Sequence, residues 1–325
     1  MKNRADDNST PTRVVSDLRE AARAIGRHQT VCCVGVFDGV HRGHQRLIAA
    51  AVEEARQRRC WSVVLTFRNH PLTVLAPAYA PLLLTDPEEK VRRLIELHPT
   101  LVACIPFDRE TADLEPATFV KEILAEQLHA ASVWCGSDFR FGRGGTGDAR
   151  LLEQMGQPLG MAAHTIEPVF VRNHLVSSTL IRSLVEQGEV QQAAECLGRD
   201  HVVEGPVVSG HGRGRQLGYP TANLAPPPAV VLPADGIYAV RVEAGGRLHD
   251  GMMHLGPAPT FDIAQPRLEV HLFDFRGELL GKTIRIHFVS FLREVLRFDS
   301  ADQLVAQIKA DEQNARTIPQ SKSHE

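Results

Sequence analysis

The chain has 325 residues, of which 43% are hydrophobic and 23% charged, and its formal net charge is −3 at pH 7. This length exceeds that of one ordinary hydrophobic core and predicts two domains, while the slightly acidic charge argues against binding to nucleic acid. Residues 1–13 lack the apolar core of a signal peptide and no apolar run could span a bilayer, so we expect a cytoplasmic protein without membrane contacts. The six cysteines form no C-x-x-C pair, which predicts buried thiols in a reducing compartment.

The first half of the chain alternates short apolar runs with helical patterns. We predict strands at residues 31–37, 62–67, 101–107, 132–135 and 164–170. We predict helices at residues 45–58, 88–97, 116–127, 178–187 and 190–197. Strands that are apolar throughout and alternate with helices are typical of a parallel sheet covered on both faces.

A phosphate site is indicated where the first strand meets the first helix. The sequence there, from residue 35 to residue 44, is Gly-Val-Phe-Asp-Gly-Val-His-Arg-Gly-His, so His41 and His44 lie three apart at the helix start and share one face. The free N–H groups and the dipole of a helix N-terminus attract anions, and Gly43 lets a ligand approach the backbone closely. Two surface histidines would be the simpler reading of the pair alone. The preceding strand and turn favour the phosphates of a nucleotide.

Two further segments of this half carry polar groups at positions suited to a ligand. One strand ends in Thr-Phe-Arg-Asn-His-Pro, residues 66–71, at the edge where open α/β sheets usually bind ligands. Ser-Ser-Thr at residues 177–179 stands at the start of the helix predicted at residues 178–187, and Arg182 follows one turn later. One hydroxyl group would serve as the N-cap, and the remaining groups would suit a second phosphate contact.

These segments, together with Gly-Ser-Asp-Phe-Arg-Phe-Gly at residues 136–142, resemble the adenylyltransferase module of bacterial bifunctional riboflavin kinase/FAD synthetases. The resemblance implies a Rossmann-like nucleotidyltransferase domain in which His41 and His44 are catalytic. The residues that it implies for binding ATP and its phosphates are Gly35, Phe37, Asp38, Gly43, Ser177, Ser178, Thr179 and Arg182. The residues that it implies for binding flavin are His70, Pro71, Asp138 and Phe139.

The hydrophobic period changes near residue 200. Short alternating segments at residues 202–208, 236–242, 267–275 and 283–288 predict a small antiparallel barrel, with a hairpin turn at Gly245-Gly246. Ser300 and Gln303 then form the capping pattern of a final helix. We therefore expect an α/β domain over residues 14–198 and a β-barrel domain with a terminal helix over residues 199–318.

The barrel domain contains a glycine-rich loop and a carboxylate within a strand. Four glycines and two arginines between residues 210 and 218 could wrap a phosphate chain, although a plain linker would have the same composition. Thr221 and Asn223 offer the oxygen ligands that Mg²⁺ prefers. Alternation places Glu269 on the face opposite Leu268 and Val270, where it is either a solvent-exposed carboxylate or a base in a pocket. The alternation leaves both readings open.

The barrel segments resemble the riboflavin kinase module of the same bifunctional enzymes. The matching stretches are Pro-Thr-Ala-Asn at residues 220–223, Gly-Ile-Tyr-Ala at 236–239, Gly-x-x-Pro-Thr-Phe at 256–261 and Leu-Glu-Val-His-Leu at 268–272. The resemblance implies that Glu269 is the catalytic base and that Arg293 and Phe298 contact the flavin. The residues that it implies for ATP phosphates are Gly210, Gly212, Arg213, Gly214, Arg215, Thr221 and Asn223, the last two also as metal ligands.

The combined resemblance, from about residue 30 to residue 316, implies two reactions. Riboflavin and ATP would give FMN in the barrel domain, and FMN and ATP would give FAD and pyrophosphate in the α/β domain, with Mg²⁺ in both steps. We expect riboflavin, FMN and ATP as ligands, and a monomer or weak homo-oligomer. The chain departs from the family pattern at His254, Leu280 and Val295, on the flavin side of the kinase. A kinase with a single activity and a flavin-binding regulator with one dead site are the alternatives.

Overall fold

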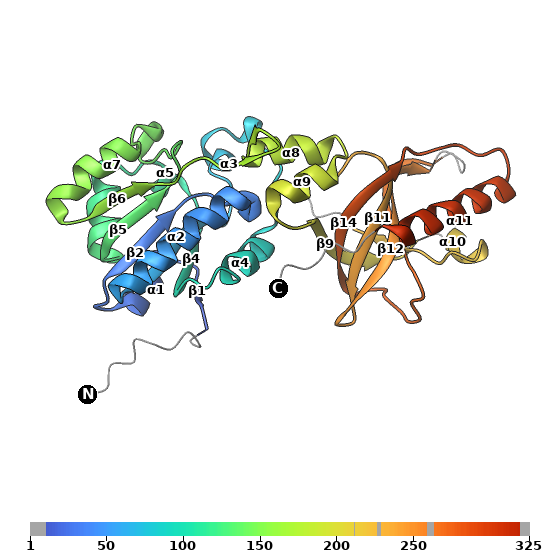
Figure 1. The fold of residues 1–325 in the computed structure, drawn as a ribbon, viewed down its shortest axis with the longest axis horizontal. Helices are drawn as coiled ribbons and strands as arrows, with labels where there is room; N and C mark the ends of the chain where they lie inside the picture. Colours follow the sequence, from blue (N-terminus) through green and yellow to red (C-terminus); the bar gives the residue numbers. More distant parts are fainter. Residues whose placement is uncertain (1–10, 211, 226–228, 259–262, 319–325) are drawn as a thin grey trace. The chain divides into compact units, whose positions relative to one another are not determined.

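The computed structural model describes residues 11–318 except 211, 226–228 and 259–262, and it leaves out the side chains of residues 213, 258 and 263–267 (Figure 1). Contacts divide the chain into two compact units, with the division after Val176. Helices α8 (Ser178–Glu186) and α9 (Val190–Leu197) belong to the second unit, because Val190 packs into the core of the barrel. The predicted domain limits, 14–198 and 199–318, remain predictions.

The first unit contains a six-stranded sheet in the order β1-β4-β3-β2-β5-β6, and each adjacent pair is parallel. The parallel sheet expected from the apolar runs is therefore confirmed. Its strands are β1 (Arg13–Val15), β2 (Thr30–Val34), β3 (Trp61–Phe67), β4 (Leu101–Ile105), β5 (Ala130–Cys135) and β6 (Ala162–Thr165).

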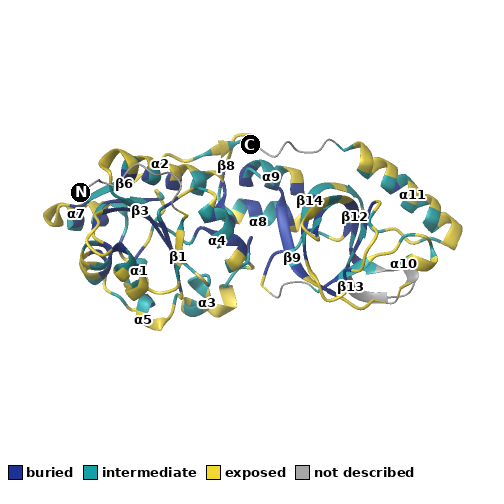
Figure 2. Cartoon of the chain, turned by 90° about the horizontal axis from the view of Figure 1, so that it is seen from below, coloured by how far each residue is buried: buried dark blue, intermediate teal, exposed yellow. Residues whose placement is uncertain are grey.

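Helices cover both faces of this sheet, and its central strands are largely buried beneath them (Figure 2). One face packs against α1 (Leu18–Ile25), η3 (Phe119–Gln127) and α7 (Ala149–Gly156), and the other against α2 (Arg42–Arg58) and α4 (Pro87–Ile95). The strands serve both cores because successive side chains point to opposite faces. The short elements of this unit are η1 (Asp38–Val40), α3 (Leu72–Leu75), η2 (Pro77–Tyr79), α5 (Arg109–Ala112), α6 (Pro116–Thr118), η4 (Arg143–Gly145) and η5 (Gln157–Leu159).

Three predicted strands of this unit are longer than the strands in the structure. The strand predicted at 101–107 ends at Ile105. The strand predicted at 31–37 ends at Val34, because the chain turns and Phe37 adopts a left-handed conformation with φ of 51°. The strand predicted at 164–170 is wrong in extent, since β6 ends at Thr165 and Phe170–Val171 (β7) pairs instead with His174–Leu175 (β8). Pro168 lies between β6 and β7, and proline has no N–H to donate to a strand ladder.

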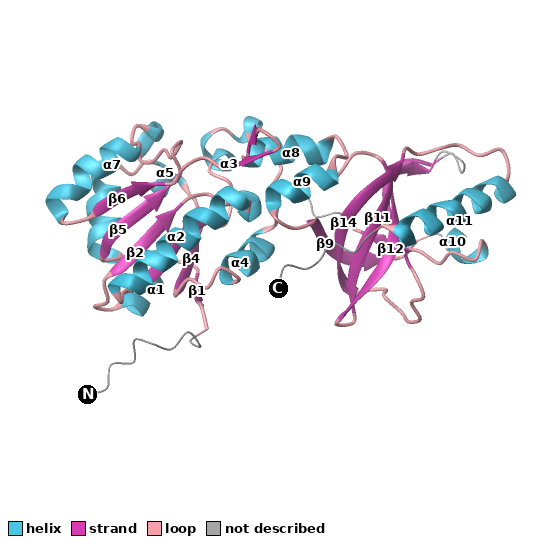
Figure 3. Cartoon of the chain, viewed as in Figure 1, coloured by secondary structure: helices cyan, strands magenta, loops and turns pink. Residues whose placement is uncertain are grey.

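The second unit contains a closed barrel in the order β10-β13-β12-β11-β14-β9, with antiparallel pairs throughout (Figure 3). This confirms the predicted barrel. Its strands are β9 (His201–Val208), β10 (Ala222–Leu224), β11 (Gly236–Ala244), β12 (Arg247–Ala258), β13 (Ile263–Leu272) and β14 (Thr283–Arg293).

Alternating side chains fill the barrel. Tyr238, Met253, Val270 and Phe288 are buried in its core. The final helix, α11 (Ala301–Thr317), begins as predicted at the N-cap Ser300, whose hydroxyl accepts a hydrogen bond from Gln303 N. The remaining helix of this unit is the short α10 (Arg213–Gln216).

Candidate active sites

The segment that follows β2 forms a tight turn at the carboxyl edge of the sheet. Phe37 is 1% exposed, and its left-handed backbone directs its ring back over Gly35. A Cβ atom on Gly35 would lie 2.8 Å from that ring, which leaves no room for another residue. Gly35 and Phe37 therefore shape the turn that leads into α2.

Asp38 is buried within this turn and serves as its anchor. Its carboxylate accepts hydrogen bonds from the backbone N–H groups of Leu84 at 2.9 Å and Thr85 at 3.4 Å. The Thr85 hydroxyl in turn accepts a bond from Gly39 N. These contacts fix the turn before α2. The predicted contact of Asp38 with phosphate stays a prediction.

The two histidines of the motif stack on each other at the start of α2. Their ring centroids lie 3.5 Å apart with an interplanar angle of 18°, and the edge of Phe37 meets His44. His41 is the N-cap, and its Nδ1 accepts a hydrogen bond from His44 N at 3.3 Å. Because Nδ1 is the acceptor, the proton of the neutral ring is on Nε2, which is an N–H donor. A Cβ atom on Gly43 would lie 3.1 Å from the His41 ring, so a side chain there would have to displace that ring by a few tenths of an ångström.

Lys90, which the sequence had not marked, lies beneath the same turn. Its side chain is buried, and Nζ donates hydrogen bonds to the carbonyl oxygens of Val36 at 3.3 Å and of Phe67. The Thr66 hydroxyl also donates to Val36 O. In the sequence, Lys90 precedes the apolar Leu94 by four residues. This helical spacing is the one sequence signal that could have indicated a buried position for Lys90.

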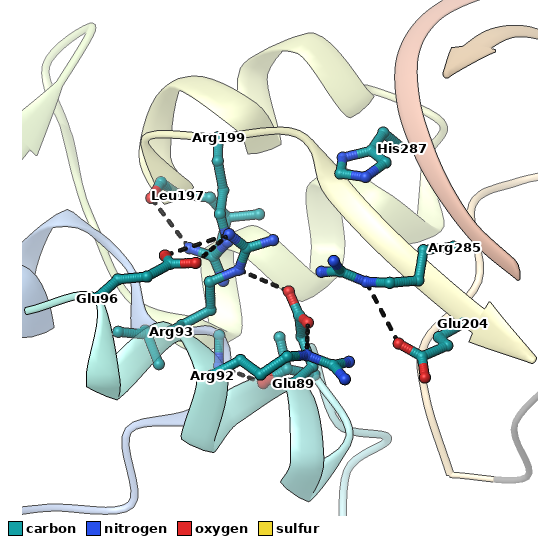
Figure 4. Close-up of polar contacts among 12 residues, drawn as sticks. Glu89, Arg92, Arg93, Glu96, Leu197, Arg199, Glu204, Arg285 and His287 are labelled. Carbon is teal, nitrogen blue, oxygen red and sulfur yellow. Dashed lines mark hydrogen bonds and ion pairs between the residues drawn. The ribbon is translucent and has the colours of Figure 1, made fainter. Parts of the chain in front are cut away.

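The neighbouring Glu89 is also buried, and arginines of its own helix surround it (Figure 4). Its carboxylate binds Arg92 at 2.9 Å and Arg93 at 2.6 Å, and Arg93 continues to Glu96. In the second unit, the guanidinium group of Arg285 binds Glu204 in a similar pair. Burial lowers the pKa of Arg93, but the charges and hydrogen bonds of Glu89 and Glu96 outweigh it and leave that pKa raised. None of the residues in these pairs belongs to the predicted sites.

The residues predicted to bind flavin in the first unit lie in two loops. His70 Nδ1 accepts a hydrogen bond from Leu72 N at 3.2 Å, and Pro71 is the N-cap of α3. Asn69 ties this loop to the segment after β4, since its side chain exchanges two hydrogen bonds with the backbone of Phe107. Asn69 thus fixes the position of this loop.

The second loop contains Asp138 and Phe139. Phe139 closes a turn onto Gly136 O, and its ring stacks on Phe141 with centroids 5.5 Å apart. A Cβ atom on Gly136 would lie 2.8 Å from Asp138 Oδ1, so a side chain there would require the Asp138 carboxylate to move. The roles predicted for these residues and for His70 and Pro71 in flavin binding remain predictions.

The hydroxyl-rich segment begins α8 in the second unit. Ser177 is the N-cap and accepts a hydrogen bond from Leu180 N at 3.2 Å, as the capping reading expects. Ser178 and Arg182 are four residues apart and share one face of the helix, while Thr179 is exposed. The joint action of this segment with the histidine pair remains a prediction.

One register row of the barrel brings together residues from the kinase prediction. Asn223 pairs with Glu269, Glu269 with His254, His254 with Ile237, and Ile237 with Arg293, across five adjacent strands. The flanking residues, such as Met253 and Val270, fill the barrel, so the row faces outward. The row is a product of strand pairing, which no local pattern reveals.

Glu269 is half-buried on this outer face, between the two readings that the sequence left open. Its cross-strand neighbour His254 has a lowered pKa, because burial disfavours the charged ring more than the Glu269 carboxylate favours it. The chain before β10 reaches this face at the next outward position of β13, where His271 Nδ1 lies 2.7 Å from Pro220 O and the ring meets Tyr219.

The glycine loop folds directly onto the two predicted metal ligands. A Cβ atom on Gly210 would collide with the Asn223 side chain, and one on Gly214 would lie 3.2 Å from Thr221 Oγ1. Tyr219 N donates to Gly214 O at 2.8 Å, which closes the loop. The structure thus brings both glycines to the oxygen groups beside Glu269.

Three other loop residues of the prediction are less closely placed. Gly212 adopts a left-handed φ of 69°, and Arg215 is exposed. The side chain of Arg213 lies outside the described residues, so its predicted phosphate contact is not tested.

Arg293 and Phe298, predicted to contact flavin, contact each other, since the Arg293 guanidinium lies 5.9 Å from the Phe298 ring centroid. The same guanidinium forms a two-pronged ion pair with Asp311 of α11, with a shortest distance of 2.7 Å. Asp311 is 3% exposed, so this pair fixes the end of β14 to the terminal helix. Among the departures from the family pattern, Leu280 is exposed and Val295 half-buried.

The stacked histidine pair and the Asn223–Glu269 pair, at the centres of the two predicted phosphate sites, lie in different units of the chain. The chain matches the FAD synthetase family model over residues 25–180 and the riboflavin kinase model over residues 197–319. A relative from Escherichia coli, named bifunctional riboflavin kinase/FMN adenylyltransferase, is 37% identical over 88% of this chain and 91% of its own length. A relative of the same name from Bacillus subtilis is 33% identical over 88% of this chain and 92% of its own length. The chain belongs to the family of bifunctional riboflavin kinase/FMN adenylyltransferases.

A solved structure shares the fold across both units. It is a Streptococcus pneumoniae protein named macrolide-efflux protein, 32% identical, with a TM-score of 0.84 over 95% of this chain and 100% of that one. The name belongs to that protein, and the likeness to this chain is one of sequence and fold. Among the residues that the structure describes, no helix is both long and apolar enough to cross a membrane.

Proposed function

We infer that the chain converts riboflavin and ATP to FMN in its barrel domain, and FMN and ATP to FAD and pyrophosphate in its N-terminal domain. One observation carries this conclusion. The same chain has a stacked imidazole pair at a helix N-terminus and, in its barrel, a carboxylate beside oxygen ligands under a glycine loop. The two arrangements suit different phosphate chemistry, and the family named above joins these two activities.

In the kinase step we assign proton removal to Glu269. Its carboxylate would accept the proton of the riboflavin 5′-hydroxyl as that oxygen attacks the γ-phosphate of ATP and ADP leaves. The half-buried position of Glu269, next to Asn223 in the register row, supports this role. The glycine loop would enclose the phosphates with backbone N–H groups, so that this step depends mainly on positioning.

We propose Mg²⁺ as the metal of both steps, with Thr221 and Asn223 as its protein ligands in the kinase. Hydroxyl and amide oxygens suit this hard ion, and the glycines at 210 and 214 leave the space in front of both side chains without a Cβ atom. When bound, the ion supplies neutralisation of phosphate charge. Two protein ligands fit an ion that keeps most of its contacts with phosphate and water.

In the adenylyl step the nucleophile is the phosphate of FMN, which is already anionic and needs no base. Its oxygen attacks the α-phosphate of ATP, and pyrophosphate leaves. The Nε2–H of His41 and the ring of His44 would stabilise the charge that develops on these phosphates, as would the N-terminus of α2. We assign Arg182 and the hydroxyl groups of residues 177–179 to the same phosphates.

We further propose that the protein acts in the cytoplasm as a monomer or weak homo-oligomer. Five of the six cysteines are buried, and burial raises the pKa of thiols such as Cys32 to about 12, so they behave as small apolar residues in a reducing compartment. Its ligands are then riboflavin, FMN and ATP. Sedimentation at several protein concentrations tests the oligomeric state.

Incubation of the purified chain with riboflavin, ATP and Mg²⁺, followed by chromatographic separation of flavins, tests the whole assignment. We expect FMN to appear first and FAD to follow, with pyrophosphate equal to FAD. FMN without FAD would indicate a kinase with a single activity. Flavin binding without turnover would indicate a regulator, and both results would contradict the assignment.

A further inference from the structure

Lys90 is a buried charged residue to which the two reactions as described give no task. It is 4% exposed and lies in α4, packed against the carboxyl ends of two central strands. Its Nζ bridges the carbonyl oxygen of Val36, which follows β2, and that of Phe67, which ends β3. The bridged segment is the one that continues through the Phe37 turn to His41.

The charged and titratable groups around Lys90 come from the turn and from β4. Asp38, 3% exposed, and Cys104, 7% exposed, interact electrostatically with the ammonium group. Arg68 and Glu88 act on Cys104 from the rim of this cluster. Burial lowers the pKa of Lys90, and the nearby Asp38 and Cys104 oppose that effect.

A neutral donor would satisfy two carbonyl oxygens at lower cost, because taking an ammonium group out of water is strongly unfavourable. The positive charge therefore needs a reason beyond these hydrogen bonds. Asp38 supplies one. Its carboxylate is required to hold Leu84 and Thr85 on the turn, yet it places a buried negative charge three residues from the His41 cap.

A triphosphate bound at the N-terminus of α2 would meet that negative charge at short range. Like charges in a partly buried site repel strongly, and screening by solvent is weak there. Lys90, from α4, reaches the same turn through its bond to Val36 O and carries the opposite charge. The pair Asp38–Lys90 thus lets the turn be tied down by a carboxylate without repelling the ligand.

We propose that Lys90 is a positioning residue of the adenylyl step, which holds the turn carrying His41 through two carbonyl bonds and offsets the charge of Asp38 beside the ATP phosphates. The proposal rests on the function inferred above. It predicts an effect on the use of ATP in FAD formation, because Lys90 acts through the turn and through its charge, without touching the reacting atoms.

The test uses the full chain supplied with FMN, ATP and Mg²⁺. Lys90→Gln keeps N–H donors for the carbonyl groups but removes the charge, and we expect it to raise the KM for ATP about tenfold while kcat falls less. Lys121→Gln removes an exposed lysine of the same unit and is the matched control, with KM unchanged. Formation of FMN from riboflavin reports that each variant is folded.

A double-mutant cycle with Asp38→Asn separates charge compensation from packing. In the Asn background, Lys90→Gln should change the KM for ATP by no more than about twofold, because the charge to be offset is gone. An equally large effect in both backgrounds, or no effect in the native background, would overturn the proposal. Failure of the wild-type chain to make FAD would instead contradict the inferred function.

Lys90→Arg covers the case in which the glutamine variant does not fold. It keeps the positive charge, so its KM for ATP should stay within about threefold of the native value. A folded arginine variant with a KM raised tenfold would also overturn the proposal.

Discussion

Asn223 and Glu269 pair directly across the antiparallel strands β10 and β13, so an amide oxygen and a carboxylate share one outward position on the barrel. The pairing joins the predicted metal ligand to the predicted base without any loop between them. Residues on paired strands are held by the ladder, which makes their spacing less variable than that of groups on loops.

This pairing gives the sharpest test of the kinase. Glu269→Gln keeps the shape of the side chain but removes the proton acceptor, and FMN formation should fall by roughly two to four orders of magnitude. FAD formation from supplied FMN should persist and serves as the folding control. Native kinase turnover in this variant would show that Glu269 is a surface carboxylate.

The histidine pair allows capping to be separated from chemistry. His41→Ala removes both the cap acceptor for His44 N and the ring donor, whereas His41→Asn restores an acceptor only. Both variants, and His44→Ala, should lower FAD formation by roughly two to three orders of magnitude, as for loss of one oriented donor. In thermal unfolding, His41→Ala should lower the free energy of unfolding by about 1 kcal/mol, because it removes the cap acceptor. His41→Asn keeps an acceptor and should not lower it. Full FAD formation in all variants would exclude the helix-end phosphate site.

Gly210 tests the fit of the phosphate loop. Gly210→Ala would push a methyl group into the Asn223 side chain and should lower FMN formation about tenfold or more, in line with ~1–3 kcal/mol for overpacking. Ser209→Ala, a change at the exposed neighbouring residue, is the control and should leave FMN formation intact. Steady-state rates of FMN formation at varied ATP concentration measure both variants. Equal rates for Gly210→Ala and Ser209→Ala would mean that the loop lies away from Asn223.

His201 makes the stability of the barrel depend on pH. Burial lowers its pKa to about 4 from an ordinary 6.5, and its Nε2 lies 3.1 Å from Val231 O. The unfolded chain therefore binds a proton that the folded chain excludes, so stability is full above pH 6.5 and falls as the pH drops toward 4, by about 3 kcal/mol. Urea unfolding followed from pH 7 to pH 4 measures this loss. The variant His201→Gln keeps an N–H donor but has no titrating ring. Between pH 7 and pH 4 it should therefore lose about 3 kcal/mol less of its free energy of unfolding than the native chain.

We expect FMN formation and FAD formation to depend on different parts of the chain, which can be tested with fragments. A fragment from Ser177 onward should phosphorylate riboflavin and make no FAD. A fragment from His201 lacks α9, and Val190 of that helix packs into the barrel core, so this shorter fragment should unfold at a lower temperature. Circular dichroism on heating measures the difference. FAD formation by either fragment would contradict the assignment of the adenylyl step to the N-terminal domain.

Local sequence patterns were sufficient to predict much of the fold and of the candidate sites. The strand-to-helix change around His41 and the alternation around Glu269 depend on neighbours in sequence, and both are visible without a structure. The outward row from Asn223 to Arg293 depends on strand pairing between distant segments, and the burial of Lys90 depends on packing between α4 and the sheet. Asp38 shows the limit most clearly, since its motif suggests a ligand contact while its carboxylate also binds the backbone of Leu84 and Thr85.

The register row also determines which changes of length the barrel can accept. Residues can be added at the Gly245-Gly246 turn without altering any pairing of His254 with its neighbours. Deletion of one residue inside β12, between that turn and His254, would shift the pairing by a position and turn outward side chains into the barrel. Related chains should therefore differ in the lengths of their hairpin turns, and keep constant the number of residues between paired positions of this row.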